Sequence, residues 1–157
     1  MTAGASAAPI LVNNPSFEII PAGGLPLTAG CEGAGCSYNA GPGSIPDWTN
    51  SGFSGEFIAG VQVGNHFAFD FMPDGVAGAY SNTAGPSIIS QTVAQTVQLG
   101  VSNTLQVDFG LRHDAPSFSP ATADLLINGI RYSATGVAPS PGSCQRLRPP
   151  MSVLPQM

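Results

Sequence analysis

Arg112, His113 and Asp114 form the most chemically suggestive triplet of the sequence, and they lie where an alternating segment, TLQVDFGLRH, ends and a loop begins. Arginine offers a planar fork of donors and aspartate offers a pair of acceptor oxygens, a combination suited to binding hydroxyl groups. An ion pair between Arg112 and Asp114 that closes the end of a strand is an equally good interpretation. In both cases a strand must end close to residue 113, so that the polar groups lie in the loop that follows it. The three residues are therefore candidate ligand-binding residues.

Asp70, Trp48 and Tyr80 complete the set of candidate ligand-binding residues. Asp70 follows His66 by four residues, which on a strand separates their α-carbons by about 13 Å, too far for one metal ion without a bend. Solvated polar side chains are the preferred interpretation of that pair. Trp48 and Tyr80 could stack on a sugar ring, although a single tryptophan is more often part of a core.

Hydrolytic chemistry has little support in the sequence. The G-x-S-x-G motif of serine hydrolases is absent, because the glycines around Ser54 have the wrong spacing. Paired carboxylates could cleave a glycoside if their separation in space allowed it. The candidate pairs are Asp70 with Asp74 and Asp108 with Asp114. We therefore expect a protein that carries out no bond chemistry and is not an enzyme.

The composition indicates one small domain made of short strands. The chain has 157 residues, 20 of them glycine and 15 proline, and such frequent turn residues favour strands and turns over helices. Nine acidic residues outnumber four basic ones, for a net charge of −5, so the cationic surface that nucleic acid requires is missing. The sequence also lacks the run of ~20 apolar residues that spans a membrane.

Two alternating segments predict the core of a β-sandwich. In HFAFDF, the side chains of Phe67, Phe69 and Phe71 share one face of a strand. In TLQVDFGLRH, the odd-numbered residues from Leu105 to Leu111 share another, and we expect these two faces to meet across two layered sheets. The Asn128-Gly129 pair lies between two β-rich runs and predicts a hairpin.

The ends of the chain differ in character from its middle. Residues 1–8 are rich in small side chains and are expected to be a leader remnant or disordered, whereas residues 9–138 form the β-sandwich domain. Residues 139–157 contain no acidic or aromatic residue, and we expect an irregular, disordered tail that supplies no strands, as a frameshift would produce. The sandwich would then lack its last strands. Cys31 and Cys36, in CEGAGC, are expected to form a disulfide, with two free thiols as the alternative.

Five segments together suggest a family: LVNNPSFE, IPDWTNSG, PDGVAGAYSN, ISQTV and TLQVDFGLRHD. The sequence resembles the galactose-binding-domain-like jelly rolls, including carbohydrate-binding modules and exported bacterial PEP-CTERM-type surface proteins, over residues 10–136. The resemblance implies an all-β jelly-roll sandwich that binds glycans. It also implies a structural calcium ion bound by Glu18, with a partner acid that would fall in residues 139–157.

The resulting expectation is a non-catalytic carbohydrate-binding or surface-adhesion module of an exported protein, located outside the cell or on its surface. Its partner would be a glycan or surface polysaccharide, with no nucleic acid and no membrane span. A structural domain of a surface or matrix protein without glycan specificity is the main alternative. A small glycoside-active enzyme is the third.

Overall fold

The computed structural model describes eleven β-strands and, in the residues it describes, no helix. The described residues are 10–27, 37–58, 61–62, 65–66, 69–81, 85–96, 101, 103–113 and 121–147. The strands are β1 (Ser37–Tyr38), β2 (Thr49–Ser51), β3 (Ser54–Ile58), β4 (Val61–Gln62), β5 (Asn65–His66), β6 (Ala77–Ser81), β7 (Ile88–Ser90), β8 (Val107–Gly110), β9 (Asp124–Ile127), β10 (Ile130–Ser133) and β11 (Cys144–Leu147). The predicted all-β class is confirmed, while the finer prediction of a jelly roll stays a prediction.

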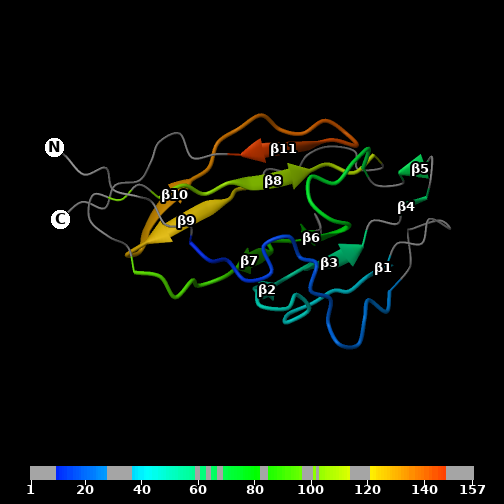
Figure 1. Cartoon of the computed structure of the whole chain (residues 1–157), viewed down its shortest axis with the longest axis horizontal. Helices are drawn as coiled ribbons and strands as arrows, with labels where there is room; N and C mark the ends of the chain where they lie inside the picture. Colours follow the sequence, from blue (N-terminus) through cyan, green and yellow to red (C-terminus); the bar gives the residue numbers. More distant parts are fainter. Residues whose placement is uncertain are drawn as a thin grey trace.

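Antiparallel pairing joins the strands into one three-stranded sheet, in the order β1-β3-β6, and four two-stranded sheets. The two-stranded sheets are β2-β7, β4-β5, β8-β11 and β9-β10. Figure 1 shows β8 and β11 in one layer, with β2, β3, β6 and β7 in a second layer below it. Phe69 packs between the two layers at one end. Its ring stacks on Phe57 of β3 and lies against Gly110 of β8.

The three-stranded sheet depends on glycines that make room for aromatic rings. Phe57 of β3 lies opposite Gly78 of β6, and Tyr80 of β6 lies opposite Gly55 of β3. A Cβ atom on Gly78 would come within 2.9 Å of the Phe57 ring. Each ring therefore packs over the bare backbone of the neighbouring strand, which gives this sheet one aromatic face.

The β8-β11 pair contradicts the expectation that residues 139–157 supply no strand. β11 pairs with β8 in a register that places Arg146 opposite Asp108. The Arg146 guanidinium donates two hydrogen bonds to the Asp108 carboxylate, Nε to Oδ1 at 2.9 Å and Nη2 to Oδ2 at 2.8 Å. Leu147 is only 7% exposed. The composition of the segment was a poor guide, because four residues are enough to complete a two-stranded pair.

The two alternating segments do not meet as predicted. Leu105, Val107 and Phe109 are half-buried and Leu111 is buried, so their common face is confirmed. Phe69, however, lies against the opposite face of β8: a Cβ atom on Gly110 would be 2.5 Å from its ring. Phe71 is 56% exposed, because residues 69–71 lie outside any strand and the two-residue period does not apply to them. Phe67 lies outside the described residues.

The hairpin prediction is confirmed. β9 and β10 pair with Ile127 opposite Ile130, so Asn128 and Gly129 form the two-residue turn. Their φ angles of 50° and 79° are both positive, as the type I′ turn requires. The predicted disulfide between Cys31 and Cys36 lies outside the described residues.

Candidate functional site

His113 and Asp70 form the site's central contact. The Nε2 atom of His113 lies 3.0 Å from Oδ1 of Asp70, and the two side chains are 43% and 68% exposed. The pair joins residues 43 positions apart in the sequence. A histidine hydrogen-bonded to a carboxylate is a common arrangement for moving protons. The structure thus brings together two residues that the sequence singled out separately.

Three chain segments fix this pair in place. The backbone N–H of Asp70 donates to the carbonyl oxygen of Gly142 at 2.8 Å, and the N–H of Gly142 donates to the carbonyl oxygen of Leu111 at 2.7 Å. Gly142 has a φ of +80°, and a Cβ atom there would lie 2.2 to 2.8 Å from atoms of the His113 ring. The imidazole therefore rests against a position that only glycine can occupy without a clash.

An aromatic cluster adjoins the His113–Asp70 pair through Phe69, the residue before Asp70. Phe69 is 7% exposed and stacks on Phe57, with ring centroids 6.0 Å apart. Phe57 also meets the edge of Tyr80 at 6.4 Å, and Tyr80 meets Tyr38 at 6.1 Å. The Tyr80 hydroxyl donates to the carbonyl oxygen of Asn39 at 2.7 Å, which holds its ring in the cluster. We call Tyr38, Phe57, Phe69 and Tyr80 the aromatic cluster.

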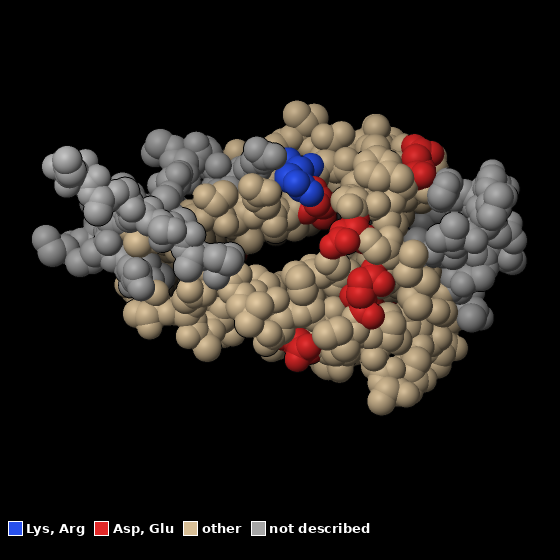
Figure 2. Space-filling model, in the orientation of Figure 1, with Lys and Arg blue, Asp and Glu red and all other residues tan. Residues whose placement is uncertain are grey.

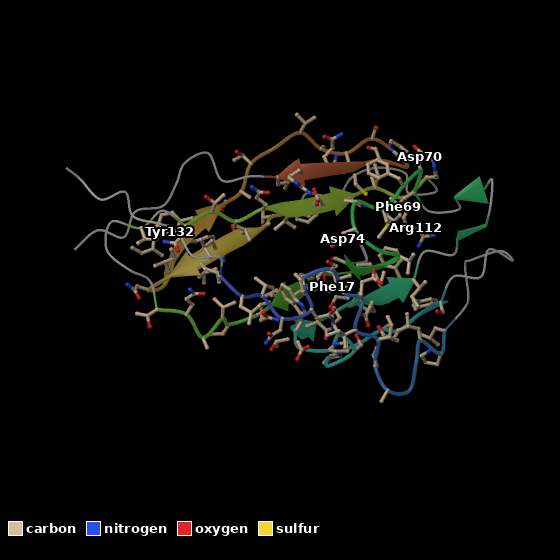
Figure 3. All side chains as sticks on the ribbon, in the orientation of Figure 1. Phe17, Phe69, Asp70, Asp74, Arg112 and Tyr132 are labelled. Carbon is tan, nitrogen blue, oxygen red and sulfur yellow. The ribbon has the colours of Figure 1, made fainter. Side chains whose placement is uncertain are left out.

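Acidic side chains gather beside a hollow between the two layers. Figure 2 shows this hollow, with several acidic residues along part of its rim and one basic residue among them. Asp74, labelled in Figure 3, lies beside the gap between the layers. Its carboxylate accepts a hydrogen bond from the Ser16 hydroxyl. Carboxylates around a hollow lined by low-dielectric protein stabilise positive charge within it.

The carboxyl groups of Glu18 and Glu56 lie close enough to influence each other. Oε1 of Glu18 accepts hydrogen bonds from the backbone N–H groups of Val76, at 2.7 Å, and Ala77, at 2.8 Å. Glu56, in β3, is 0% exposed, and neither of its carboxyl oxygens has a hydrogen-bond partner. Burial, and to a smaller extent the negative charge of Glu18, raises the pKa of Glu56 to about 7.

The predicted site residues separate into three groups. Asp70 and His113 are in contact, and Figure 3 shows Phe69, Asp70 and Arg112 together at one end of the molecule. Tyr80 belongs to the aromatic cluster. Trp48 lies elsewhere, with its indole N–H donating to the carbonyl oxygen of Asn14 at 3.0 Å and its ring 5.2 Å from that of Phe17. These contacts tie Trp48, which is half-buried, to the N-terminal segment, and its predicted role in ligand binding stays a prediction.

Asp114 lies outside the described residues, so its ion pair with Arg112 stays a prediction. The side chain of His66 also lies outside them, which leaves the metal pair of His66 and Asp70 untested. In the part of the chain that the structure describes, no three His, Cys, Asp or Glu side chains are grouped closely enough to hold a metal ion. The carboxylates proposed to work in pairs have other partners instead: Asp70 binds His113, Asp74 binds Ser16 and Asp108 binds Arg146.

The sequence analysis missed Glu56, Gly142 and Phe57. Glu56 follows Ser54-Gly55, a pair typical of turns, which concealed its position in the most buried strand. Gly142 lies in the segment expected to be a disordered tail. Phe57 lies in an apolar run, FIAGVQV, which by itself does not distinguish it from its neighbours, and its contacts with the rings of Phe69 and Tyr80 depend on the fold.

An all-β protein with a histidine–carboxylate pair beside an aromatic cluster and an acidic hollow has the groups of a proton-transfer site. The chain belongs to the HpiC1-like family, described as HpiC1 cyclase, whose match spans residues 8–150. No curated protein and no solved structure was found to match the chain.

Membership of this family corrects the functional expectation. The family is named for a cyclase, which is an enzyme, so the predictions of a non-catalytic carbohydrate-binding or adhesion module and of a protein without enzymatic activity are wrong. The alternative of a structural surface domain is not supported either, and the match does not confirm a galactose-binding jelly roll or a PEP-CTERM-type protein.

The structure bears on the expected absence of a membrane span, whereas the expected glycan partner stays a prediction. None of the described residues forms a helix long and apolar enough to cross a bilayer. The expected location outside the cell stays a prediction.

Proposed function

We propose that this protein is a cyclase that closes a ring within a largely apolar, unsaturated carbonyl compound. The observation that carries the proposal is the family match across residues 8–150. A cyclase of this kind joins two atoms of one substrate and yields an isomer of it. The reaction needs groups that move protons and groups that stabilise positive charge, and needs no nucleophilic residue of the protein.

The aromatic cluster and the acidic hollow support this choice of substrate. The faces of aromatic rings attract cations by about 0.5 to 2 kcal/mol, depending on how far water is excluded. Carboxylates at the rim of the hollow (Figure 2) would stabilise the positive charge that develops as an alkene attacks an activated carbonyl group. Burial, and secondarily the charge of Asp108, raises the pKa of the Cys144 thiol, which disfavours the nucleophilic thiolate form. The net charge of −5 disfavours nucleic acid as a partner.

The proposal is tested by incubating the full chain with citronellal, pseudoionone and geranylacetone at pH 7.5. Each of these compounds is neutral and unsaturated and isomerises to a ring in strong acid. Gas chromatography with mass detection separates a cyclic product of unchanged mass from its linear precursor. We expect at least one cyclic isomer to form faster with the protein than with a heat-denatured sample. Equal rates in both samples for all three compounds would contradict the proposal.

We also propose that Glu18 and Glu56 bind a calcium ion. The two residues would supply part of the ligand set of this ion, because Glu56 has two buried carboxyl oxygens without partners and stands beside a second carboxylate, and backbone carbonyl oxygens and water would complete the set. Calcium prefers carboxylate and carbonyl oxygens, and its charge would neutralise both glutamates. Bound there, it would hold the N-terminal segment, through Glu18, against β3 and β6. Its role would be structural, with ring closure left to the other site.

A further inference from the structure

We propose that His113 is the residue that carries the proton in the cyclisation, with Asp70 as its positioning residue. This inference rests on the proposed function and assigns the acid and base of the same reaction. It goes beyond the family match, which names no residue. The argument depends on how the two side chains are joined and held.

The contact with Asp70 fixes which nitrogen of His113 is available. A carboxylate only accepts hydrogen bonds, so Nε2, at 3.0 Å from Oδ1 of Asp70, must carry a hydrogen. The other nitrogen, Nδ1, then gains and loses the mobile proton. Among the described residues, Nδ1 has no hydrogen-bond partner, and 43% of the His113 side chain is exposed. Asp70 also stabilises the ring when both nitrogens are protonated.

The proton transfers balance without any other reactant. First, the protonated imidazole gives its Nδ1 proton to the carbonyl oxygen, so that an N–H bond breaks and an O–H bond forms. The alkene then attacks the carbonyl carbon, which forms the new C–C bond and leaves a cation on the former alkene. Finally, a C–H bond next to the cation breaks, its electrons form a new double bond, and the proton returns to Nδ1. The product is an isomer of the substrate, and nothing is oxidised or reduced.

The surroundings of the pair suit this sequence of steps. Asp70 directly follows Phe69, whose buried ring stacks on Phe57, so the backbone links the pair to the aromatic cluster. Gly142 accepts the backbone hydrogen bond of Asp70 and also borders the His113 ring. The same short segment therefore positions both members of the pair relative to each other.

A purely structural role explains the pair less well. An ion pair between side chains that are 43% and 68% exposed contributes on the order of 0 to 1 kcal/mol to stability. Such a small contribution does not account for a glycine with a positive φ that leaves space for the ring. It also means that substitutions of either residue are expected to leave the protein folded.

The test compares four proteins on the cyclisation of citronellal, in which the alkene closes onto the carbonyl carbon as the steps above require. The variants are His113→Gln, Asp70→Asn and, as a matched control, His66→Gln, which removes the other histidine of the chain. We expect His113→Gln to lower kcat by about 100-fold or more and Asp70→Asn by about 10-fold. KM should change by less than about twofold, as it does when an interaction made only in the transition state is lost. His66→Gln should retain the original kcat.

A fourth variant, His113→Ala, is assayed with and without added imidazole. We expect imidazole to restore part of its kcat, because the small molecule replaces the missing proton carrier, a result that a structural role would not produce. Unchanged kcat in His113→Gln, or no rescue of an inactive His113→Ala, would overturn the assignment of His113 while leaving the cyclase intact. If the unmodified chain leaves citronellal unchanged, the assignment of His113 is overturned, and if it also leaves pseudoionone and geranylacetone unchanged, the proposed function is overturned with it.

Discussion

Single residues show most clearly how burial changes chemistry in this protein, and Glu56 is the strongest case. Its side chain is fully buried, and its pKa is raised from 4.5 to about 7. In the unfolded chain the group loses its proton at a lower pH than in the folded protein. Without calcium, the folded state is therefore stabilised below pH 4.5, and this stabilisation is lost as the pH rises towards 7.

Glu56→Gln should remove this pH dependence, because glutamine has the same shape and no charge. Between pH 4.5 and pH 8, in the presence of a chelator, we expect the unfolding free energy of the original protein to fall relative to the variant by on the order of 3 kcal/mol. Urea unfolding at several pH values measures it. The same pH dependence in both proteins would show that Glu56 is not the group responsible.

Calcium should act on the same residue in the opposite sense. At pH 8 we expect added calcium to raise the unfolding temperature of the original protein by several degrees, about 1 to 2 kcal/mol, because it neutralises Glu18 and Glu56. The shift should be much smaller in Glu56→Gln. Asp47→Asn is the matched control, since Asp47 is exposed and asparagine tolerates its φ of 66°. An equal calcium shift in all three proteins would contradict the proposed site.

The sequence identified the polar residues of the site better than their partners. Asp70 and His113 were both candidates, because their types and their places near strand ends suggested chemistry. Their contact could not be predicted, since it depends on a turn at Gly142, in a segment whose composition indicated disorder. Glu56 was missed because a carboxyl group next to serine and glycine ordinarily indicates an exposed turn.

At the level of structural elements, the turn at Gly142 connects β11 to the site. Gly142→Ala places a methyl group on the His113 ring, whereas Gly129→Ala introduces the same strain, at a φ of +79°, with no atom within 4 Å. We expect both variants to lose about 1 kcal/mol of stability from the positive φ, and only Gly142→Ala to lose most of its turnover. Unfolding and kinetic measurements on the two variants test this, and equal turnover in both would show that His113 does not need this turn.

β11 offers a further test of whether the C-terminal segment belongs to the fold. Leu147 is 7% exposed and packs against Gly136, so Leu147→Ala should cost about 2 to 4 kcal/mol. Val137 is 78% exposed, and Val137→Ala should cost less than about 0.5 kcal/mol. Equal midpoints of urea unfolding for the two variants would restore the earlier interpretation of residues 139–157 as an irregular tail.

For the whole molecule, composition and alternation were enough to predict an all-β protein and its type I′ hairpin. They were not enough to predict how the layers meet. The face of β8 towards Phe69 carries Gly110, while the regular apolar face lies on its other side. Periodicity shows that two residues share a face, but the partner of that face depends on contacts between distant segments. The function was misjudged because the residues alone did not indicate the HpiC1-like family, whose match to residues 8–150 corrected it.

The most direct test of the whole account is a time course of citronellal conversion by the full chain at pH 7.5, followed by gas chromatography beside the His113→Gln variant. We predict that a cyclic isomer of unchanged mass accumulates with the original protein, and at about one hundredth of that rate or less with the variant. Indistinguishable conversion by the original protein, the variant and a heat-denatured sample would contradict the claim that this chain is a cyclase working through His113.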